Sequence, residues 1–433
     1  MKIIINVLLV LVATVGVIQS GLKILNRKSK SIGDYIFVII YIFNVVPVIL
    51  DSIFGVPDYN LVSWYSSFRK ASENETVSFV YNVYMLLCMG ALKIYLQKNE
   101  RFQSSHEELI YLDSNSSIFR GKLLLGVSLL PILYAFLTTS PVAMLTFQSA
   151  SRRGTSNVGL LMFFELMGIF AFFCWFFRRT PRLHSYFWMI AYCFLISWVD
   201  GKRYLIVVLA MIFILFYQSS YYSREKKIPL KSIVIIGIVG FAIFYVSYAL
   251  TYKVSSMVSQ NSISDWMYLS FRIDFGRDDV TKFVLYRELI EKNSILEYRG
   301  ETILSTLLFW VPRAIWASKP YPHYRYLTAA LYGTTVLGIP AGMTPSWFEM
   351  GIANFGVWFG IPLSIFIMIW LIKKGDKAKT VPHKILYLIL IESLLTQSLD
   401  AITFVLVALV VEGIFSRVRF TIGSRSLGGF NNG

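Results

Sequence analysis

The sequence predicts an all-α polytopic membrane protein with about 11 transmembrane helices and one large loop on the outer side. Of its 433 residues 56% are apolar and only 15% are charged, and the mean hydropathy is +0.59. A soluble domain carries about a quarter charged residues, so this chain has too little charge for a water-facing surface. The composition also excludes a disordered chain. The three cysteines lie in apolar runs, which argues against a disulfide-stapled fold.

Apolar runs of the length needed to cross a bilayer recur along the chain. The runs from 185 to 199 and from 385 to 397 are short, and tight turns at 200–203 and 398–400 are predicted to join each to its successor. The first run is predicted to be a retained helix because no small-x-small cleavage site follows it. The eleven runs begin near Ile3, Tyr35, Thr76, Lys122, Val158, Ser185, Tyr204, Ser232, Ala353, Ile385 and Ala401.

The orientation follows from the distribution of Lys and Arg. One set of alternate loops, together with the C-terminal tail, holds 23 of these residues, and the other short loops hold 7. Cytoplasmic loops carry the excess of positive charge, so the first set is cytoplasmic and the N-terminus lies outside. The net charge of +16 is therefore attributed to membrane topology, and no nucleic-acid partner is expected.

One long segment divides the chain into three parts. Residues 1–250 are predicted to hold helices one to eight, 251–352 a large outer loop, and 353–433 helices nine to eleven with a basic cytoplasmic tail. Loops of this length are usually functional. Asp279 is predicted to cap a helix with Val280, Phe283, Val284 and Ile290 at helical spacing. Residues 303–310 are predicted to lie on the membrane or dip into it before Pro312.

Three clusters in this loop combine arginines with aromatic residues, at 271–280, 312–322 and 342–354. Guanidinium groups bind phosphate oxygens in pairs, and aromatic rings stack on sugars, so the clusters favour a substrate with phosphate and sugar parts. The alternative is that Arg and Trp merely anchor the loop at the lipid headgroups. Lys202 and Arg203, in a tight turn at the same face, are candidates for receiving an anionic headgroup.

Other polar residues are given structural roles. Glu165 and Glu392 lie in apolar runs, where an acid is costly. Each is interpreted as the partner of a polar group on a neighbouring helix, and the alternative is a functional proton carrier. The four histidines lie far apart and show no metal-ligand spacing. No metal and no cofactor are expected.

Taken together, the layout and the loop motifs resemble the bacterial O-antigen polymerases, the Wzy-type polymerases of lipid-linked oligosaccharide repeat units. The likeness is carried by the single large outer loop in the second half of the chain and by short motifs in and near it. The turn Gly-Lys-Arg departs from the Gly-Ser-Arg-Gly form associated with relatives. The motifs are Gly201-Lys202-Arg203, Arg272-Ile-Asp-Phe-Gly-Arg277-Asp-Asp-Val, Pro312-Arg313-x-x-Trp316-x-x-Lys319-Pro320, and Thr344-Pro345-Ser346-x-x-Glu349 with Asn354.

The resemblance implies a fold similar to the multi-span glycosyltransferase C class, in the bacterial inner membrane with the active loop in the periplasm. The implied reaction transfers a growing glycan from undecaprenyl pyrophosphate to a hydroxyl of a lipid-linked repeat unit, with membrane lipids and a chain-length regulator protein as further partners. Cations would stabilise the departing pyrophosphate, and a carboxylate would accept the proton. The catalytic candidates are Arg272, Arg277, Arg313, Asp274 and Glu349, and the substrate-binding candidates are Lys202, Arg203, Trp316, Lys319, Tyr321, Tyr324 and Asn354.

Two other functions remain open at this point. An O-antigen ligase would share the donor, the membrane and the arginines, but its acceptor would be the lipid A core. A flippase or other transporter would be expected to show pseudo-symmetric halves and helix breaks at midplane depth. This chain instead concentrates its irregular sequence in the outer loop, and no internal repeat is found.

Overall fold

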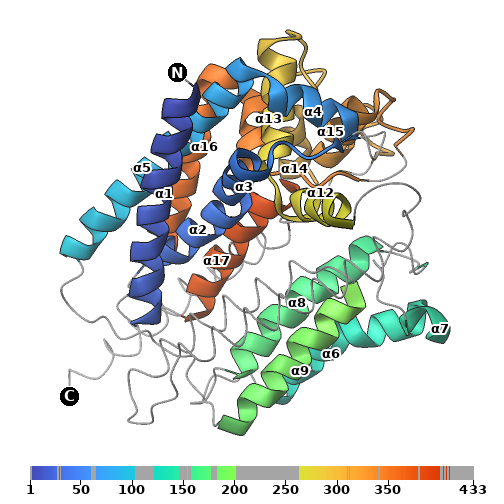
Figure 1. Ribbon diagram of the computed structural model, residues 1–433. Coiled ribbons are helices and arrows are strands. Elements are labelled where there is room, and N and C mark those ends of the chain that lie inside the picture. The colour runs from blue at the N-terminus through green and yellow to red at the C-terminus, as the bar shows by residue number, and fades with distance from the viewer. Residues whose placement is uncertain are drawn as a thin grey trace, which may run out of the picture. The chain divides into compact units, whose positions relative to one another are not determined.

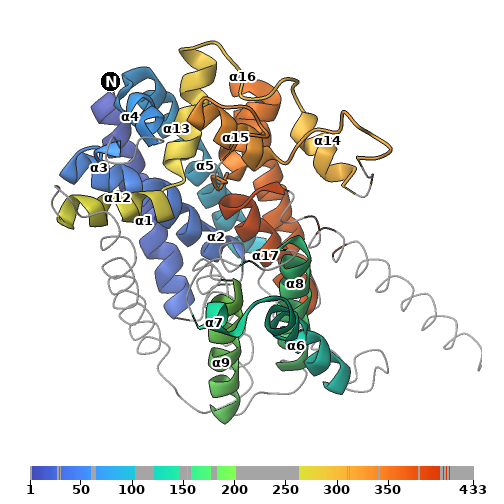
Figure 2. The ribbon, with the colours of Figure 1, turned by 90° about the vertical axis from the view of Figure 1, so that its right-hand side faces the viewer.

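In the computed structural model every described secondary-structure element is helical, as Figures 1 and 2 show. The fold class is thereby confirmed as helical. The turn that carries Lys202 and Arg203 lies outside the described residues. The structure describes residues 2–26, 29, 31–59, 65–102, 121–145, 154, 158–176, 183–200, 263–309, 311, 313–339, 342–378, 381–399, 403, 406 and 409.

The chain divides into two compact units that cut across the three predicted parts. The first comprises Met1–Ser104, Lys226–Ile372 and Ile391–Asp400, and the second comprises Ser105–Glu225, Lys373–Leu390 and Ala401–Gly433. The helices wholly in the first unit are α1 (Lys2–Leu25), α2 (Gly33–Ile40), η1 (Tyr41–Val45), α3 (Val46–Phe54), α4 (Ser66–Glu73), α5 (Glu75–Phe102), α12 (Ile263–Phe275), α13 (Asp278–Leu289), α14 (Glu301–Leu307) and α15 (His323–Tyr332). Those wholly in the second are α6 (Gly121–Thr138), α7 (Pro141–Met144), α8 (Val158–Phe176) and α9 (Leu183–Asp200), and both α16 (Trp347–Asp376) and α17 (Val381–Thr396) cross the division.

Several predicted apolar runs correspond to described helices that suit a membrane. Four stretches are long and apolar enough to span a bilayer: Ile3–Leu25, Gly33–Phe54, Glu75–Asn99 and Trp347–Asp376. Shorter apolar helices match the runs that begin near Lys122, Val158 and Ile385. The runs that begin near Tyr204, Ser232 and Ala401 lie outside the described residues, apart from single positions in the last. The described helices thus suit a membrane protein.

The first unit is built on the packing of α1 against α2 and α5, and α1 and α5 run side by side in Figure 1. Leu9 and Ala13 of α1 are fully buried, whereas Ile3 and Leu11 expose more than half of their surface. The close approach of α1 and α2 requires glycine at position 16, because a Cβ there would overlap the ring of Phe37. One side of α1 therefore packs on protein, and the other presents apolar side chains suited to lipid.

A π-helical turn, η1, interrupts the second span. Pro47 explains why carbonyl oxygens of this turn accept hydrogen bonds from other parts of the chain. Proline has no N–H, so the carbonyl oxygen of Phe43, four residues earlier, lacks its usual helical donor. The backbone N–H of Arg277 donates to that oxygen at 2.9 Å, and the Tyr81 hydroxyl donates to the next carbonyl oxygen, that of Asn44, at 2.8 Å. The start of α13 is thus attached to a break in the second span.

The helix α16 is a hairpin rather than one straight rod. Gly356 adopts φ 76° and ψ 168°, a left-handed φ that favours glycine, and the chain reverses there. Trp347 Nε1 donates to the carbonyl oxygen of Ser364 at 3.0 Å, and Gly351 lies against Gly360. Trp347–Phe355 therefore packs back on the apolar stretch that follows Gly356. The first arm begins within the predicted loop, before position 353.

The prediction for the start of α13 is partly wrong. The helix begins at Asp278 with Arg277 at the N-cap position, and no side chain caps it. Asp279 instead binds Arg272, because a buried guanidinium requires carboxylate partners. Val280, Phe283 and Val284 are buried as predicted, but Ile290 is 41% exposed.

In the second unit, α6 packs against α8 and α9. Gly168 permits the contact between α6 and α8, since a Cβ at that position would lie 2.9 Å from the ring of Pro131. The rings of Phe172 and Tyr192 stack with their centroids 3.9 Å apart, which joins α8 to α9. The candidate site described below lies wholly in the first unit.

Candidate functional site

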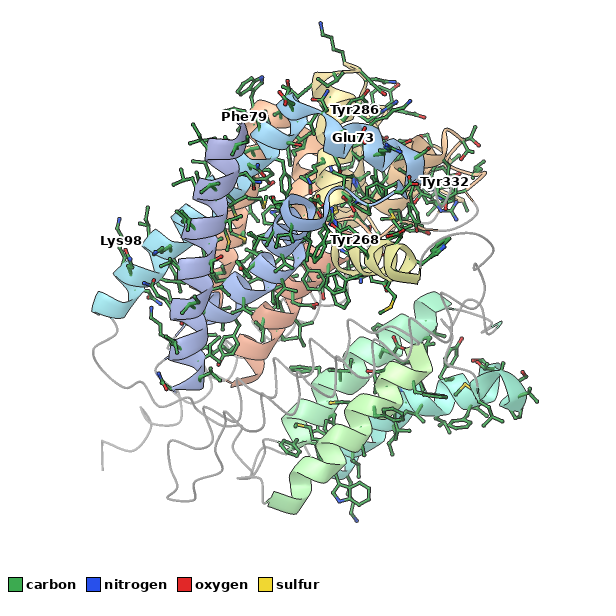
Figure 3. The ribbon with its side chains drawn as sticks, viewed as in Figure 1. Glu73, Phe79, Lys98, Tyr268, Tyr286 and Tyr332 are labelled. Carbon is green, nitrogen blue, oxygen red and sulfur yellow. The ribbon has the colours of Figure 1, made fainter. Side chains whose placement is uncertain are left out.

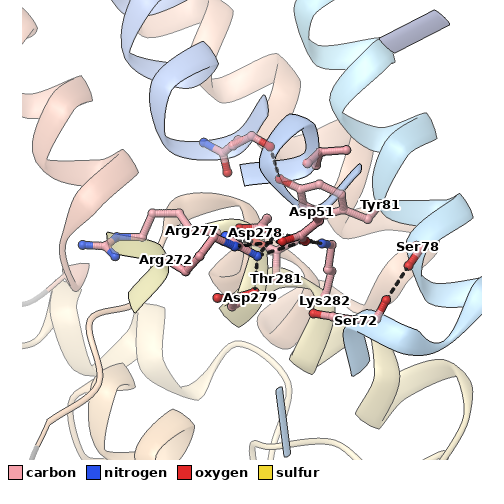
Figure 4. A network of polar contacts seen from close by, with 12 residues as sticks. Asp51, Ser72, Ser78, Tyr81, Arg272, Arg277, Asp278, Asp279, Thr281 and Lys282 are labelled. Carbon is pink, nitrogen blue, oxygen red and sulfur yellow. Dashed lines mark hydrogen bonds and ion pairs between the residues drawn. The ribbon is translucent and has the colours of Figure 1, made fainter. Parts of the chain in front are cut away.

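Arg272 lies at the centre of a buried ion cluster between α3, α12 and α13 (Figure 4). Its Nε and Nη2 donate to the two carboxylate oxygens of Asp51 at 3.0 and 3.1 Å. Nη1 and Nη2 donate to Asp278 at 2.7 and 3.0 Å, and Nη2 also donates to Asp279 Oδ1 at 2.9 Å. All three nitrogens of the guanidinium are therefore engaged by carboxylates. Arg272 is the residue that holds the cluster together.

The cluster joins three aspartates to two cations. Lys282 donates to Asp278 Oδ2 at 2.7 Å. Burial alone would raise the pKa of Asp278, but Arg272 and Lys282 lower it to about 2. Burial, aided by the charge of Asp278, raises the pKa of Asp279 to about 7 despite the opposing charge of Arg272. Tyr268, labelled in Figure 3, places its hydroxyl 3.0 Å from Asp51 Oδ1. The network is thus close to charge balance.

Arg277 is buried as well, but its guanidinium is nearly unpartnered. Figure 4 shows its side chain directed away from the carboxylates that surround Arg272. Its Nη1 donates to the carbonyl oxygen of Gly276 at 3.3 Å, and its Nε has no hydrogen-bond partner among the described residues. Burial lowers the pKa of Arg277 to about 10, opposed by the charges of Asp274, Asp279 and Glu392, so the side chain stays cationic at neutral pH. It is a fixed cation with donors to spare.

A second buried network joins α14, α15 and the first arm of α16. His323 Nε2 lies 3.1 and 3.0 Å from the two carboxylate oxygens of Glu349. His323 Nδ1 lies 3.1 Å from the hydroxyl of Thr302, which donates to Asn354 Oδ1 at 2.8 Å. Asn354 Nδ2 in turn donates to the carbonyl oxygen of Met350 at 2.8 Å. The candidate base Glu349 is therefore completely buried and paired with a histidine.

The Arg277 and Glu349 regions are joined through one contact. The hydroxyl of Thr281, one turn into α13, donates to the carbonyl oxygen of Arg277 at 3.0 Å. The same hydroxyl lies 3.5 Å from that of Ser346, which precedes Glu349 by three residues. Figure 2 shows α13 beside α15. The start of α13 thus meets the start of α16, three residues before Glu349, although the two segments are far apart in sequence.

Three cations gather near Tyr321: the exposed Arg313 and the half-buried Lys319 on the loop before α15, and the half-buried Arg325 on α15 itself. The guanidinium carbons of Arg313 and Arg325 lie 3.9 and 5.4 Å from the centroid of Tyr321. Lys319 Nζ donates to the carbonyl oxygens of residues 309 and 311 at 3.0 and 2.9 Å. Burial, and then the charge of Arg313, lowers the pKa of Lys319. The sequence has no Asp or Glu from 302 to 348. These cations thus lack an acid nearby in the sequence.

Exposed apolar side chains lie in the same stretch of chain. Leu304, Leu307, Phe309 and Ile315 expose 46, 65, 43 and 80% of their surface. α14 ends at Leu307, short of the predicted stop at Pro312. Cations beside exposed apolar groups are typical of a segment that lies at a membrane surface. The position of 303–310 at the membrane stays a prediction, and Trp310 itself lies outside the described residues.

The remaining predicted site residues have less specific surroundings. Trp316 Nε1 donates to the Ser318 hydroxyl at 3.0 Å, and the Tyr324 hydroxyl accepts from Arg325 Nε at 3.4 Å. Asp274 is half-buried on α12, where its charge acts on Arg277. The side chain of Asn354 is fully engaged by Thr302 and the backbone, so it is placed to orient the His323–Glu349 pair.

Asp51, His323 and Thr302 are among the residues of these networks that were not predicted. Asp51 stands near the end of an apolar run, and a lone acid in that position was the available signal. His323 follows Tyr-Pro at the start of α15, but its partner Glu349 is 26 residues away, so no local spacing marks the pair. Thr302 has no distinguishing sequence context. Pairings of this kind depend on tertiary packing.

No protein-family model matches this chain, and neither a curated protein nor a solved structure is significantly similar to it.

Proposed function

We propose that this protein is a membrane glycosyltransferase of the O-antigen polymerase type. It transfers a growing glycan from undecaprenyl pyrophosphate to a lipid-linked repeat unit at the periplasmic face of a bacterial inner membrane. The acceptor oxygen attacks the anomeric carbon, and the electron pair of the broken bond leaves with the pyrophosphate. The leaving group gains negative charge in the transition state, so fixed cations supply the main stabilisation.

The observation that carries this proposal is the state of Arg277. A cation held in a water-poor site with an unfilled donor interacts strongly with an incoming anion. Arg272 cannot take this part while it is bound by three carboxylates, and Arg313 is exposed to solvent. Among these three arginines, Arg277 alone combines burial with a free Nε. It is therefore assigned to the departing pyrophosphate.

The cluster of Arg313, Lys319 and Arg325 around Tyr321 is assigned to the arrival of the substrate. A polyprenyl pyrophosphate has a charged head and a long apolar tail. The exposed Leu307 and Ile315 suit the tail, and the neighbouring cations suit the phosphates. Tyr321 adds a flat face for a sugar ring. This assignment leaves Arg277 and Glu349 for the transfer itself.

The proposal is tested by deleting the gene and examining the surface glycan on a gel. A product with a single repeat unit supports the polymerase. Complete loss of surface glycan indicates a ligase or a flippase, and an unchanged pattern rejects all three functions.

Complementation of the deletion strain then tests the site. Arg277→Ala is expected to reduce chain extension about 10²–10³-fold, the usual effect of losing one donor to a developing anion. Arg277→Lys should restore little of the chain extension, because an ammonium lacks the planar pair of N–H donors of a guanidinium. Arg287→Ala, in the helix that follows Arg277, is the matched control, since the Nε of Arg287 also lacks a partner among the described residues while its Nη1 is paired with Glu291. Equal polymer from Arg277→Ala and the control would reject the assignment.

A further inference from the structure

The His323–Glu349 pair permits a count of protons from its hydrogen bonds. Asn354 Nδ2 donates to a backbone carbonyl oxygen, so Asn354 Oδ1 is the atom that faces Thr302. An amide oxygen only accepts, so the single hydroxyl hydrogen of Thr302 points to Asn354. That hydroxyl can then only accept from His323, which means that His323 Nδ1 carries a hydrogen.

The other ring nitrogen of His323 faces the carboxylate of Glu349 at 3.0 and 3.1 Å. Without a hydrogen between them, a nitrogen lone pair and a carboxylate would face each other in a fully buried place, which is unfavourable. One proton therefore lies between the two groups. The pair is either an imidazolium beside a carboxylate or a neutral imidazole beside a carboxylic acid. The two forms have the same number of protons and differ only in which group holds the shared one.

We propose that His323 is a positioning residue that holds this proton together with Glu349, and that the pair acts as one proton acceptor. The role in transfer rests on the proposed function, whereas the proton count rests on geometry alone. During transfer the acceptor hydroxyl forms the new bond to the anomeric carbon, and its proton passes to Glu349. Nε2 of His323 then shares that proton. The described geometry is the proton-bound form, and release of the proton to water restores the acceptor.

The proposal explains why the chain of bonds extends to Thr302 and Asn354. Their hydrogen bonds fix the hydrogen on Nδ1, which leaves Nε2 free to receive a proton. Without the Thr302 hydroxyl, the neutral ring would prefer to carry its hydrogen on Nε2 and donate it to an ionised Glu349. The ring could then no longer share a proton that arrives at the carboxylate.

The test is ¹⁵N magnetic resonance of the full-length protein in lipid bilayers, with labelled histidine. The chain has only four histidines, so His323→Gln identifies the signal by difference. We expect a hydrogen on Nδ1 in the wild type and in Thr302→Ser, and the neutral form with hydrogen on Nε2 in Thr302→Val. Thr306→Val is the matched control, because the Thr306 hydroxyl donates only to its own helix. A wild-type ring with a bare Nδ1, or no change in Thr302→Val, overturns the proton count.

Chain extension in vitro tests the role of the pair. Thr302→Val should lower kcat about 10²-fold with little change in KM, Thr302→Ser should retain most activity, and Thr306→Val should behave as wild type. An unchanged kcat in Thr302→Val overturns the positioning role. If the wild type itself extends no chains, the proposed function fails while the resonance result still decides the proton count.

Discussion

Gly351 and Gly360 face each other across the α16 hairpin, so closely that a Cβ on Gly360 would overlap the carbonyl oxygen of Gly351. The two arms can meet here because neither residue has a side chain. The first arm carries Glu349 and Asn354, so this contact holds one side of the candidate site in place. Arg299 adds to it by donating to the carbonyl oxygens of residues 352 and 353 at 3.3 and 2.8 Å, near the end of that arm.

The hairpin contact predicts that Gly360→Ala is destabilising. The added methyl group must displace backbone, which costs about 1–3 kcal/mol in a packed interior. Gly90→Ala is the control, because Gly90 lies in α5 with no atom within 4 Å of the added Cβ, and it should stabilise by about 0.5–1 kcal/mol. Thermal unfolding in detergent measures both. A Gly360→Ala protein as stable as Gly90→Ala would show that the arms do not pack this way.

The two buried arginines are predicted to respond differently to truncation. Arg272→Ala leaves two buried aspartates and the partly buried Asp51 facing one lysine, and breaking a buried ion pair costs about 3–5 kcal/mol. Its abundance in the membrane should fall sharply. Arg277→Ala removes a cation with an unpaired Nε and should leave abundance near the wild-type value while chain extension is lost. Immunoblots of membrane fractions, compared with the surface glycan, distinguish the two. Normal abundance of Arg272→Ala would contradict its structural role.

Asp279 predicts a pH dependence of stability. Its pKa rises from 3.8 to about 7 on folding, so the folded chain binds this proton more tightly than the unfolded chain. The stability from this group is fully present below the unfolded pKa and is lost as the pH rises through about 7. The midpoint temperature of thermal unfolding should therefore decrease as the pH is raised from 5 to 8. Asp279→Asn should make this decrease smaller. Asp265→Asn, at an exposed site on α12, should keep it, and an equal decline in all three proteins would reject the assignment.

The exposed apolar residues beside the cation cluster predict contact with lipid. A spin label at Ile315→Cys, in a chain whose three native cysteines are replaced, should be accessible to oxygen and shielded from a water-soluble nickel reagent. A label at Asn293→Cys, in the exposed turn after α13, should show the reverse. Power-saturation measurements in lipid nanodiscs report both. Equal access of the nickel reagent to the two sites would contradict the prediction that this loop lies at the membrane surface.

The sequence is sufficient to predict the helical class, because long apolar runs such as those in α5 and α16 are typical of membrane-spanning helices. It does not distinguish Gly356, where α16 reverses, from Gly360, where it continues, since both lie in one apolar run. The site is less predictable still. Arg272 and Arg277 share a motif and look alike in sequence. The fold brings Asp51, 221 residues before Arg272, to the guanidinium that Asp278 and Asp279 also bind. The Nε of Arg277 has no hydrogen-bond partner among the described residues.

The span of 221 residues between Asp51 and Arg272 has a consequence for biogenesis. Asp51 leaves the ribosome early, on the second span, and its principal partner is synthesised roughly 10–40 s later at ordinary elongation rates. Throughout that interval the Asp51 carboxylate must stay in water. The end of α3 therefore remains at the aqueous surface and cannot enter the bilayer or the core of the protein. The first unit therefore closes only after the ribosome has passed α13. A nascent chain arrested before that point should expose Asp51 to insertion factors and quality-control proteases.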